Sequence, residues 1–475
     1  MIKSSSILNI VLISSLTIGI FLRLFNINYD NLWIDEMATF WVTDPNISIE
    51  EMFLRHKSTE LAPQFYYISV YILHKIFGYD PSVGRYFSST LGVISIFLFG
   101  YLVNLIKNNG SYKLSIILVS LNVFLITYSM EMRVYILLFT ISITSLIFFV
   151  KYLNTKKIIF LFYFLFFQSI AAYTHPFSII IFIGLLFLPV HKYLNKKNND
   201  KILNLFLLFT GITVFLITFA YYYGLEITSD YQWNKQPSLK FYTNFYFSNY
   251  FGSRILGIFH LLILIYLIFL NKNFLIKNNE KMFLLLIILI LSYLLPLSFG
   301  IYRPIITSKY IIFVLIPIIS LLSILIYEIK KDKLKKILIF LFIFFTIINQ
   351  FTEQNFKQIY NERKFFKPQF SLALKHINSS QNNNYMIDVN FAKTKNLKNY
   401  YEIIYSNYLN FLSKSKNLKV NHLSLEQQKS NNINEIWIIC SYLVSGDNCK
   451  NIDSDFKVVD QIIFKNLYLT LVKYN

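Results

Sequence analysis

Long runs of apolar residues recur along the first three quarters of the chain. Two examples are IIFLFYFLFF at residues 158–167 and LLLIILILSYLLPL at 284–297. Repeated runs of about 15 to 21 apolar residues are typical of membrane-spanning helices, because the bilayer core is about 30 Å thick. Of all residues 55% are hydrophobic and only 15% are charged, whereas soluble domains carry about 25% charged residues. The sequence therefore predicts an α-helical polytopic membrane protein.

These runs predict about eleven transmembrane helices. The first run has the length of a signal peptide, but it has no A-x-A-like cleavage site and many spans follow, so we expect it to be retained. The apolar segment 61–77 contains Tyr, His and Lys side chains that suit a helix lying along the membrane surface. The expected spans are 7–25, 87–106, 114–129, 134–153, 158–173, 176–190, 202–222, 255–270, 282–299, 310–327 and 337–349.

Lysine residues are concentrated in alternate short loops, near residues 110, 155, 196, 276 and 332. This is the positive-inside pattern, which predicts that these loops and the N-terminus are cytoplasmic. A twelfth span at 61–77 would move every later basic loop to the outside, which is a second reason to place that segment on the surface. The net charge of +20 is explained by these loops, so we expect a lipid bilayer and not a nucleic acid as the partner.

The composition changes near residue 350. Residues 1–350 are expected to form the transmembrane domain, with a large first outer loop at 26–86. Residues 351–475 are rich in Asn, Lys, Gln and Ser, and no stretch there is long enough to span a membrane. Segments 385–390, 435–443 and 466–475 have the pattern of strands, and 370–380 and 395–415 that of helices. We expect a small extracytoplasmic α/β domain of about 110 residues.

The two cysteines of the chain, Cys440 and Cys449, both lie in this C-terminal region. The Ser-Gly-Asp-Asn cluster between them predicts a turn, and an oxidising compartment would permit a disulfide. Two small residues without a bridge are the alternative. The cysteine spacing matches no zinc motif and no His cluster has metal-ligand spacing, so we expect neither a metal nor a cofactor.

Charged side chains at the outer ends of spans are functional candidates, because charge is costly at membrane depth. A carboxylate can accept a proton from an attacking hydroxyl, and cations can hold a phosphate leaving group. Each candidate also has a structural alternative. These are a solvated acid pair in a first helical turn for Asp35 and Glu36, a local ion pair for Glu131 and Arg133, a helix-start residue for His175, and an interfacial anchor for Arg303 and Lys309. The candidates are Asp35 and Glu36 in the first outer loop, and Glu131, Arg133, His175, Arg303 and Lys309 at later outer joints.

Five motifs occur in an order that resembles the GT-C glycosyltransferases, specifically bacterial relatives of protein O-mannosyltransferases and of lipid A aminoarabinose transferases. The motifs are RLFNINYDNLWIDEMATF, APQFYYISVYILHKIFGYDPSVGRYFSS, YSMEMRVYILL, AYTHPF and RPIITSKYIIFVLIP, within residues 20 to 320. The chain departs from the family pattern at Ala62, where His is common, at Gln64, where a second Pro is common, and at Met130, where Gln is usual. Lys309 stands in place of the usual Arg, which keeps the charge but loses the bidentate fork.

The resemblance implies transfer of a sugar from a polyprenyl (undecaprenyl) phosphate carrier to a hydroxyl of a glycoconjugate acceptor. The acceptor would be lipid A, a polysaccharide, a glycolipid or a protein on the outer face of a bacterial cytoplasmic membrane. It implies that Asp35 is the base, with Glu36 beside it, and that the reaction inverts the anomeric carbon; a retaining route needs a second, nucleophilic carboxylate. It also implies donor phosphate or sugar binding by Glu131, Arg133, His175, Arg303, Lys309 and Tyr310, supported by Pro63, Tyr66, Tyr67 and Arg85.

A flippase or transporter of lipid-linked glycans is the alternative class, since it would share the spans and the basic loops. Transporters tend to show paired halves with helices broken near mid-membrane. Here the charges are expected at outer helix ends, and the acid pair lies in a large outer loop, which favours an enzyme. A polymerase-like enzyme with a different donor is a further alternative.

Overall fold

The computed structural model describes residues 4–59, 62–195, 200–223, 247–275, 279–302, 307–352, 367–389, 395–423, 434–441, 456–464 and 466–474. The chain divides into two compact units, unit 1 and unit 2. Most of the predicted outer loop 26–86 belongs to the same unit as the C-terminal residues. Unit 1 comprises Met1–Phe25, His56–Val70 and Val83–Glu362, and unit 2 comprises Asn26–Arg55, Tyr71–Ser82 and Arg363–Asn475.

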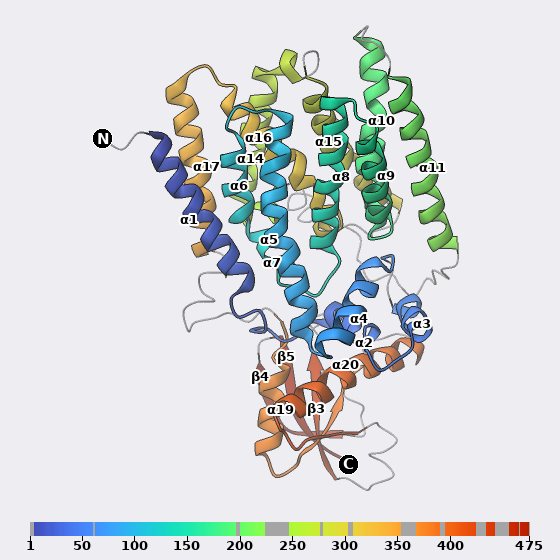
Figure 1. The fold of residues 1–475 in the computed structure, drawn as a ribbon. Helices are drawn as coiled ribbons and strands as arrows, with labels where there is room; N and C mark the ends of the chain where they lie inside the picture. The colour runs from blue at the N-terminus through green and yellow to red at the C-terminus, as the bar shows by residue number, and fades with distance from the viewer. Residues whose placement is uncertain are drawn as a thin grey trace. The chain divides into compact units, whose positions relative to one another are not determined.

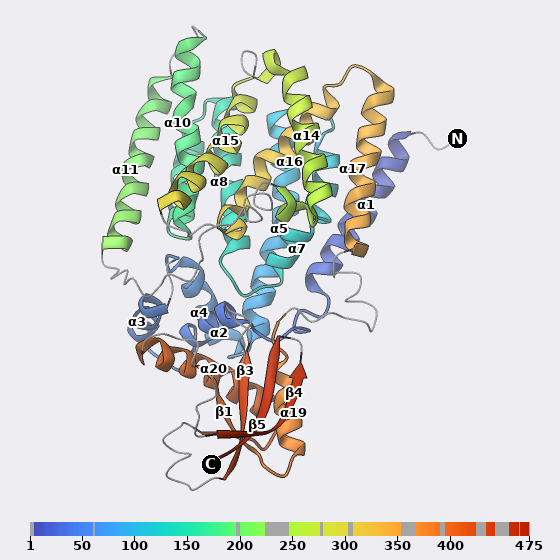
Figure 2. The same cartoon turned by 180° about the vertical axis from the view of Figure 1, so that it is seen from behind.

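Unit 1 is a bundle of long helices that lie side by side in both views (Figures 1 and 2). Every predicted span coincides with one of these helices or with a pair of them. The long helices are α1 (Ser4–Leu24), α5 (Pro81–Ile106), α8 (Tyr135–Thr155), α9 (Ile159–Ala172), α10 (Ile179–Leu194), α11 (Lys201–Tyr223), α14 (Arg254–Leu270), α15 (Glu280–Tyr302), α16 (Leu315–Tyr327) and α17 (Asp332–Thr352). Shorter helical segments of the same unit are α6 (Tyr112–Ser120), α7 (Val123–Ser129), α13 (Asn249–Phe251) and the 3-10 segments η1 (Pro176–Ser178) and η5 (Ser308–Val314).

Seven helices of the described residues are long and apolar enough to cross a membrane, or eight if α6 and α7 form one bent span. The predicted spans 158–173, 255–270 and 337–349 coincide with α9, α14 and α17, which are not among these. The fold is thus that of a polytopic membrane protein, and the count of eleven stays a prediction. Helix α4 (Phe65–Phe77) has 13 residues, which corresponds to about 20 Å and is too short to span.

The lysine-rich connections of unit 1 meet at one end of the bundle. This grouping agrees with the alternate-loop pattern of the sequence, because loops on one side of a membrane must meet at one end of the helices. Four contacts join the ends of these helices: Lys107 Nζ to Glu328 at 3.7 Å, Lys192 Nζ to Glu280 at 3.7 Å, and the Leu105 carbonyl oxygen to Asn154 Nδ2 at 3.1 Å and to Lys281 Nζ at 3.5 Å.

The predicted span 114–129 is broken into α6 and α7, which are bent by 57°. Asn122 has an extended backbone between the two helices, and its side-chain oxygen accepts from the Leu125 backbone N–H at 2.9 Å. An asparagine in this position caps a new helix and ends the previous one. The break places α7 and the joint that follows it at a fixed angle to α6.

Side chains from other helices satisfy the carbonyl groups that this break exposes. Arg23 is fully buried and donates to the carbonyl oxygens of Ser120 at 2.7 Å and Val119 at 3.0 Å, and Gln350 donates to that of Leu121. Gly19 permits this approach, because a Cβ atom there would lie 2.6 Å from the Ser120 oxygen. Unpaired carbonyls are costly in a membrane, so these donors stabilise the break. Arg23 therefore acts inside the bundle, and not as an interfacial anchor.

Unit 2 combines helices α2 (Ile34–Val42), α19 (Phe370–Ser379) and α20 (Lys395–Ser415) with a five-stranded sheet of order β2-β1-β3-β5-β4. β1 pairs in parallel with β2 and β3, and β5 pairs antiparallel with β3 and β4. The predicted C-terminal helices and three strands are confirmed, whereas β2 and β4 were not predicted. The strands are β1 (Asn384–Ile387), β2 (Asn421–His422), β3 (Glu435–Ser441), β4 (Phe456–Phe464) and β5 (Leu467–Tyr474).

Helix α2 is part of the core of unit 2. Phe40 stacks on Tyr79 with ring centroids 3.9 Å apart and meets Phe411 of α20 edge-on at 5.2 Å. The Tyr408 hydroxyl of α20 accepts from the Leu32 backbone N–H at 3.0 Å. The segment that carries the acid pair is therefore held by the C-terminal region.

Cys440 lies in β3 within a buried apolar cluster on one face of the sheet. It is disulfide-bonded. Cys449 lies outside the described residues, so the predicted pairing of these two cysteines stays a prediction.

Candidate functional site

The acid pair lies in the first turn of α2, where carboxylates are stabilised by the helix dipole. Asp35 is half-buried, whereas Glu36 is fully buried. The Glu36 carboxylate accepts a hydrogen bond from Lys367 Nζ at 2.6 Å. Lys367 precedes α19 and lies 331 residues after Glu36 in the chain. Sequence reasoning missed this lysine, because no local pattern connects it with the acid pair.

The two carboxylates are therefore not equivalent. A short, charge-assisted bond to Lys367 fixes the Glu36 side chain and compensates its buried charge. Asp35 keeps partial contact with solvent and can meet a substrate.

Unit 1 brings together cations and aromatic rings from three joints between helices. Arg133 lies between α7 and α8, His175 between α9 and η1, and Lys309 in η5. The Arg133 guanidinium lies 5.9 Å and Lys309 Nζ 5.2 Å from the ring centre of Tyr135. The Tyr310 ring lies 5.2 Å from that of His175 and 6.1 Å from that of Tyr135. We call these five residues the cation–aromatic cluster.

His175 is an uncharged member of this cluster. It caps η1, and its Nδ1 accepts from the Phe177 backbone N–H at 3.3 Å, which places the ring proton on Nε2. Burial lowers the pKa of His175 to about 3, and the charges of Arg133 and Lys309 act in the same direction. At neutral pH the ring can donate a hydrogen bond without carrying charge.

The joint that carries Glu131 and Arg133 is buried, with both residues less than a tenth exposed. The Arg133 backbone N–H donates to the Glu131 carbonyl oxygen at 2.8 Å. Gly84 of α5 makes room for this joint, because a Cβ atom there would lie 2.4 Å from the Met132 side chain. Both charged side chains are therefore held inside the joint and away from bulk solvent.

The predicted support residues Pro63, Tyr66, Tyr67 and Arg85 are all buried. The Tyr66 hydroxyl shares a hydrogen bond with that of Ser88 at 2.8 Å, which joins α4 to α5.

His56 is a buried residue that the sequence analysis did not single out. It belongs to α3 (Ile49–Thr59), and its ring meets that of Tyr67 edge-on at 4.5 Å. Burial lowers the pKa of His56 to about 3, and the charge of Arg133 acts in the same direction. The charge of Arg133 thus acts on two buried histidines, His56 and His175.

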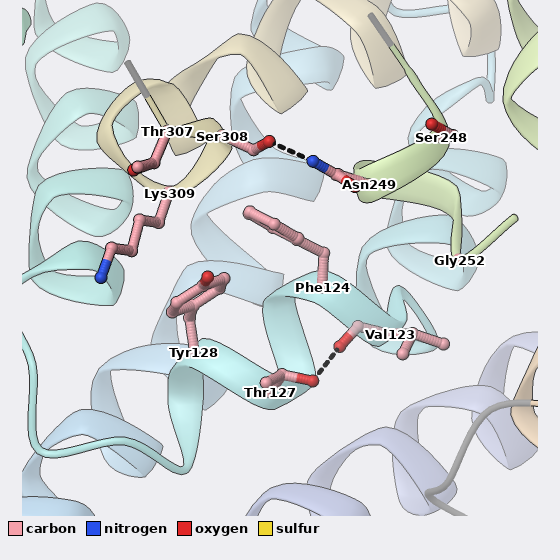
Figure 3. A pocket seen from close by; sticks show the side chains of 10 residues that line it. All are labelled: Val123, Phe124, Thr127, Tyr128, Ser248, Asn249, Gly252, Thr307, Ser308 and Lys309. Carbon is pink, nitrogen blue, oxygen red and sulfur yellow. Dashed lines mark hydrogen bonds between the residues drawn. The ribbon is translucent and has the colours of Figure 1, made fainter. Parts of the chain in front are cut away.

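A cavity of about 520 Å³ opens beside the cluster. Figure 3 shows Phe124 and Tyr128 pointing from α7 toward η5, which carries Ser308 and Lys309. Asn249 of α13 also lines the cavity, and its side-chain amide donates to the Ser308 hydroxyl of η5. The predicted site residues Arg133, His175, Lys309 and Tyr310 are therefore brought together, and Lys309 also lines the cavity.

Arg303 lies outside the described residues, and Asp35 and Glu36 belong to unit 2. In the described part of the chain, no group of three or more His, Cys, Asp or Glu side chains is placed to hold a metal ion. The chemistry that the unit 1 residues offer is recognition of an anion by two fixed cations beside a cavity of hydroxyl, amide and aromatic groups.

No family model and no curated protein matches this chain by sequence. By structure it is similar to ArnT from Cupriavidus metallidurans in the apo state, with a TM-score of 0.58 and 10% identity over 99% of this chain and 98% of ArnT. ArnT bound to undecaprenyl phosphate gives a TM-score of 0.52 and 11% identity over 97% of each chain. The apo oligosaccharyltransferase of Archaeoglobus fulgidus gives 0.54 and 10% identity over 92% of this chain and 69% of its own. These neighbours are GT-C membrane glycosyltransferases, and at these identities the likeness establishes the architecture: the chain has the GT-C fold.

Proposed function

We propose that this protein transfers a sugar from a polyprenyl-phosphate carrier to a hydroxyl group of a cell-envelope acceptor. The observation that carries the proposal is the cation–aromatic cluster, in which Arg133 and Lys309 lie over the Tyr135 ring beside the cavity. The GT-C fold supports it, since ArnT with this fold binds undecaprenyl phosphate.

In the proposed reaction, an acceptor hydroxyl oxygen attacks the anomeric carbon of the donor sugar. The bond from that carbon to the phosphate oxygen breaks, and polyprenyl phosphate leaves with the electron pair. Arg133 and Lys309 stabilise the growing negative charge, and the neutral His175 ring donates a further hydrogen bond. Asp35 accepts the hydroxyl proton.

The state of Glu36 supports inversion at the anomeric carbon. A retaining enzyme needs two carboxylates that both reach the sugar, one of them as a nucleophile. Glu36 is buried and bound to Lys367, which leaves Asp35 as the accessible member of the pair. We assign Glu36 a positioning role.

The arrangement of unit 1 supports a phosphate site on the outer face of a bacterial cytoplasmic membrane. Helix α8 begins at Tyr135 in the cluster and ends at Thr155, next to Lys156 at the lysine-rich end. Its 21 residues correspond to about 31 Å, close to the thickness of the bilayer core. With the lysine-rich end in the cytoplasm, the cluster faces the outside. The acceptor class is lipid A, a polysaccharide, a glycolipid or a protein.

Retention of undecaprenyl phosphate by the purified full-length protein tests the phosphate site, with native mass spectrometry as the readout. Arg133→Met and Lys309→Met should each weaken retention about tenfold or more, because a charge-assisted hydrogen bond to the carrier is lost. Lys330→Met is the matched control, since Lys330 is exposed at the lysine-rich end. Equal retention by all three variants would place the phosphate elsewhere. Consumption of a sugar-loaded carrier on addition of an envelope extract separates a transferase from a flippase, which would bind the carrier without cleaving it.

A further inference from the structure

Helix α2 carries the acid pair in its first turn, and side chains from outside the helix bind its other end. The last carbonyl groups of a helix have no partner within the helix, so other groups satisfy them. The Tyr79 hydroxyl donates to the Phe40 carbonyl oxygen at 2.9 Å and accepts from Asn407 Nδ2 of α20 at 2.9 Å. Arg55 Nη1 donates to the Trp41 carbonyl oxygen at 3.1 Å. All of these contacts lie within unit 2.

His74 of α4 makes the contact at the very end of α2. Thr43 is the C-cap residue of α2, and its carbonyl oxygen lies 2.9 Å from His74 Nδ1. The other ring nitrogen, Nε2, lies 3.2 Å from the Asp80 carbonyl oxygen. His74 is only 1% exposed, and the rings of Phe40 and Tyr79 meet it edge-on at 5.9 and 5.4 Å, which fixes the plane of the imidazole.

The imidazole of His74 can donate to only one of the two carbonyl groups while it carries a single proton. Burial lowers the pKa of His74, against the opposing effect of the two carbonyl groups and of the Asp80 and Asp44 carboxylates, so the ring is neutral at neutral pH. The shorter contact is the one to Thr43, and it holds the proton on Nδ1. The accepting carbonyl lies at the C-terminal end of α2, where the helix dipole makes it a stronger acceptor.

The position of α2 decides the position of Asp35. The helix has nine residues, which correspond to about 14 Å, and it moves as a rigid rod. Lys367 binds its first turn through Glu36, whereas His74 binds its last turn. A shift at either end displaces the Asp35 carboxylate, and a displacement of about 1 Å can reduce a rate about 100-fold.

We propose that His74 is a positioning residue of the transfer reaction, which seats α2, and with it the Asp35 carboxylate, through its hydrogen bond to the Thr43 carbonyl group. The inference rests on the proposed function and deepens it, because it assigns a role to a residue that acts through the helix of the acid pair. The proposal requires the donor on Nδ1. A donor at the position of Nε2 reaches Asp80 and cannot replace it.

Two substitutions of His74 separate these two donors. The amide nitrogen of Asn is one bond beyond Cγ, as Nδ1 is, so His74→Asn keeps a donor for the Thr43 carbonyl group. The amide nitrogen of Gln is two bonds beyond Cγ, as Nε2 is, so His74→Gln keeps a donor for the Asp80 carbonyl group and loses the bond to Thr43. Both side chains are neutral amides, and they differ chiefly in which carbonyl group they reach.

Release of undecaprenyl phosphate by the full-length protein tests the proposal, with the source bacterium's own lipid extract as the donor pool and its envelope extract as the acceptor. His74→Gln should lower the rate at saturating extract about tenfold or more, whereas His74→Asn should retain about half of the wild-type rate or more. The amount of lipid extract that gives the half-maximal rate, and the retention of added undecaprenyl phosphate, should stay at the wild-type level in both variants. The reason is that the proposed phosphate site belongs to unit 1.

Hydrogen–deuterium exchange in the peptide that covers α2 measures its seating without using the reaction. His74→Gln and Tyr79→Phe should each accelerate exchange there about tenfold, because each removes the donor of a carbonyl group at the end of α2. Tyr71→Phe is the matched control. Tyr71 also belongs to α4, and its hydroxyl donates to the Ile47 carbonyl oxygen at 2.7 Å, outside α2. This variant should change neither the rate nor the exchange of the α2 peptide.

Equal rates and equal exchange in His74→Asn and His74→Gln would overturn the inference, and so would a wild-type rate in His74→Gln. If His74→Gln does not fold, the pair Tyr79→Phe and Tyr71→Phe decides the question, and equal rates and exchange in these two would overturn it. Absence of any undecaprenyl phosphate release by wild type would instead refute the proposed function, and the exchange of the α2 peptide would still test the contact of His74.

Discussion

The ion pair between Glu36 and Lys367 provides the sharpest test of how unit 2 holds the acid pair. Its two charged atoms are 2.6 Å apart, and the side chains are 0% and 15% exposed. Lys367→Met keeps much of the volume of the lysine stem but leaves the Glu36 carboxylate buried without its cation. Removing one partner of a buried pair costs about 3–5 kcal/mol, since the remaining charge loses its compensation.

A second pair in the same protein serves as the control. Lys336 Nζ lies 2.7 Å from Asp332 Oδ2, which is nearly the distance in the Glu36–Lys367 pair, but these two side chains are 62% and 68% exposed. Water screens this pair, so Lys336→Met should change local stability little. The two pairs have the same charges at nearly the same distance, but the control pair is exposed and joins residues four apart in one helix, so it shows the small effect expected of a screened local pair.

Hydrogen–deuterium exchange of the intact protein in detergent measures both effects locally, in peptides covering residues 34–42 and 332–340. Lys367→Met should accelerate exchange in the first peptide about 100-fold or more. Lys336→Met should accelerate exchange in the second less than about fivefold. The double variant Glu36→Gln/Lys367→Met should be more stable than Lys367→Met alone, because no charge remains buried. Equal effects of Lys367→Met and Lys336→Met, or no recovery in the double variant, would refute the assignment of a burial-dependent ion pair.

Three further predictions concern the base, the buried histidine and the broken span. Asp35→Asn should reduce transfer about 100-fold or more while undecaprenyl phosphate retention stays at the wild-type level, and transfer near wild type would remove Asp35 as the base. The folded-state pKa of His175, about 3, lies below its unfolded value of about 6.5, so the unfolded chain binds the extra proton between these values. Stability should therefore fall by about 1.4 kcal/mol per pH unit on acidification from 6.5 toward 3, and thermal unfolding of His175→Asn should lack this part of the slope. Arg23→Met should lower stability by about 3 kcal/mol or more, because two carbonyls at the α6–α7 break lose their donor, and Arg23→Lys should recover only part of it in thermal unfolding.

Much of the architecture could be predicted from local pattern. Apolar runs identify helices in a membrane because transfer into the bilayer depends on each segment's own side chains. The alternation of lysine-rich loops predicted which connections share one end of the bundle, and the contacts of Lys107, Lys192 and Lys281 agree. The strands β1, β3 and β5 were visible because they are apolar and largely buried. The order of motifs also led to the candidates Arg133, His175 and Lys309, which the fold does bring together.

Other features were decided by contacts between distant parts of the chain. The run 114–129 is apolar throughout, and its break depends on donors from Arg23 and Gln350 on two other helices. Strand β4 is mostly exposed and shows no alternation of buried and exposed residues, so only its pairing with β5 defines it as a strand. Likewise, no local pattern in the sequence predicts the burial of His56, the ion pair of Lys367 or the cavity. Partition between lipid and water is a property of a segment alone, whereas an ion pair, a capped helix break or a cavity exists only where the tertiary fold brings separate segments within a few ångströms.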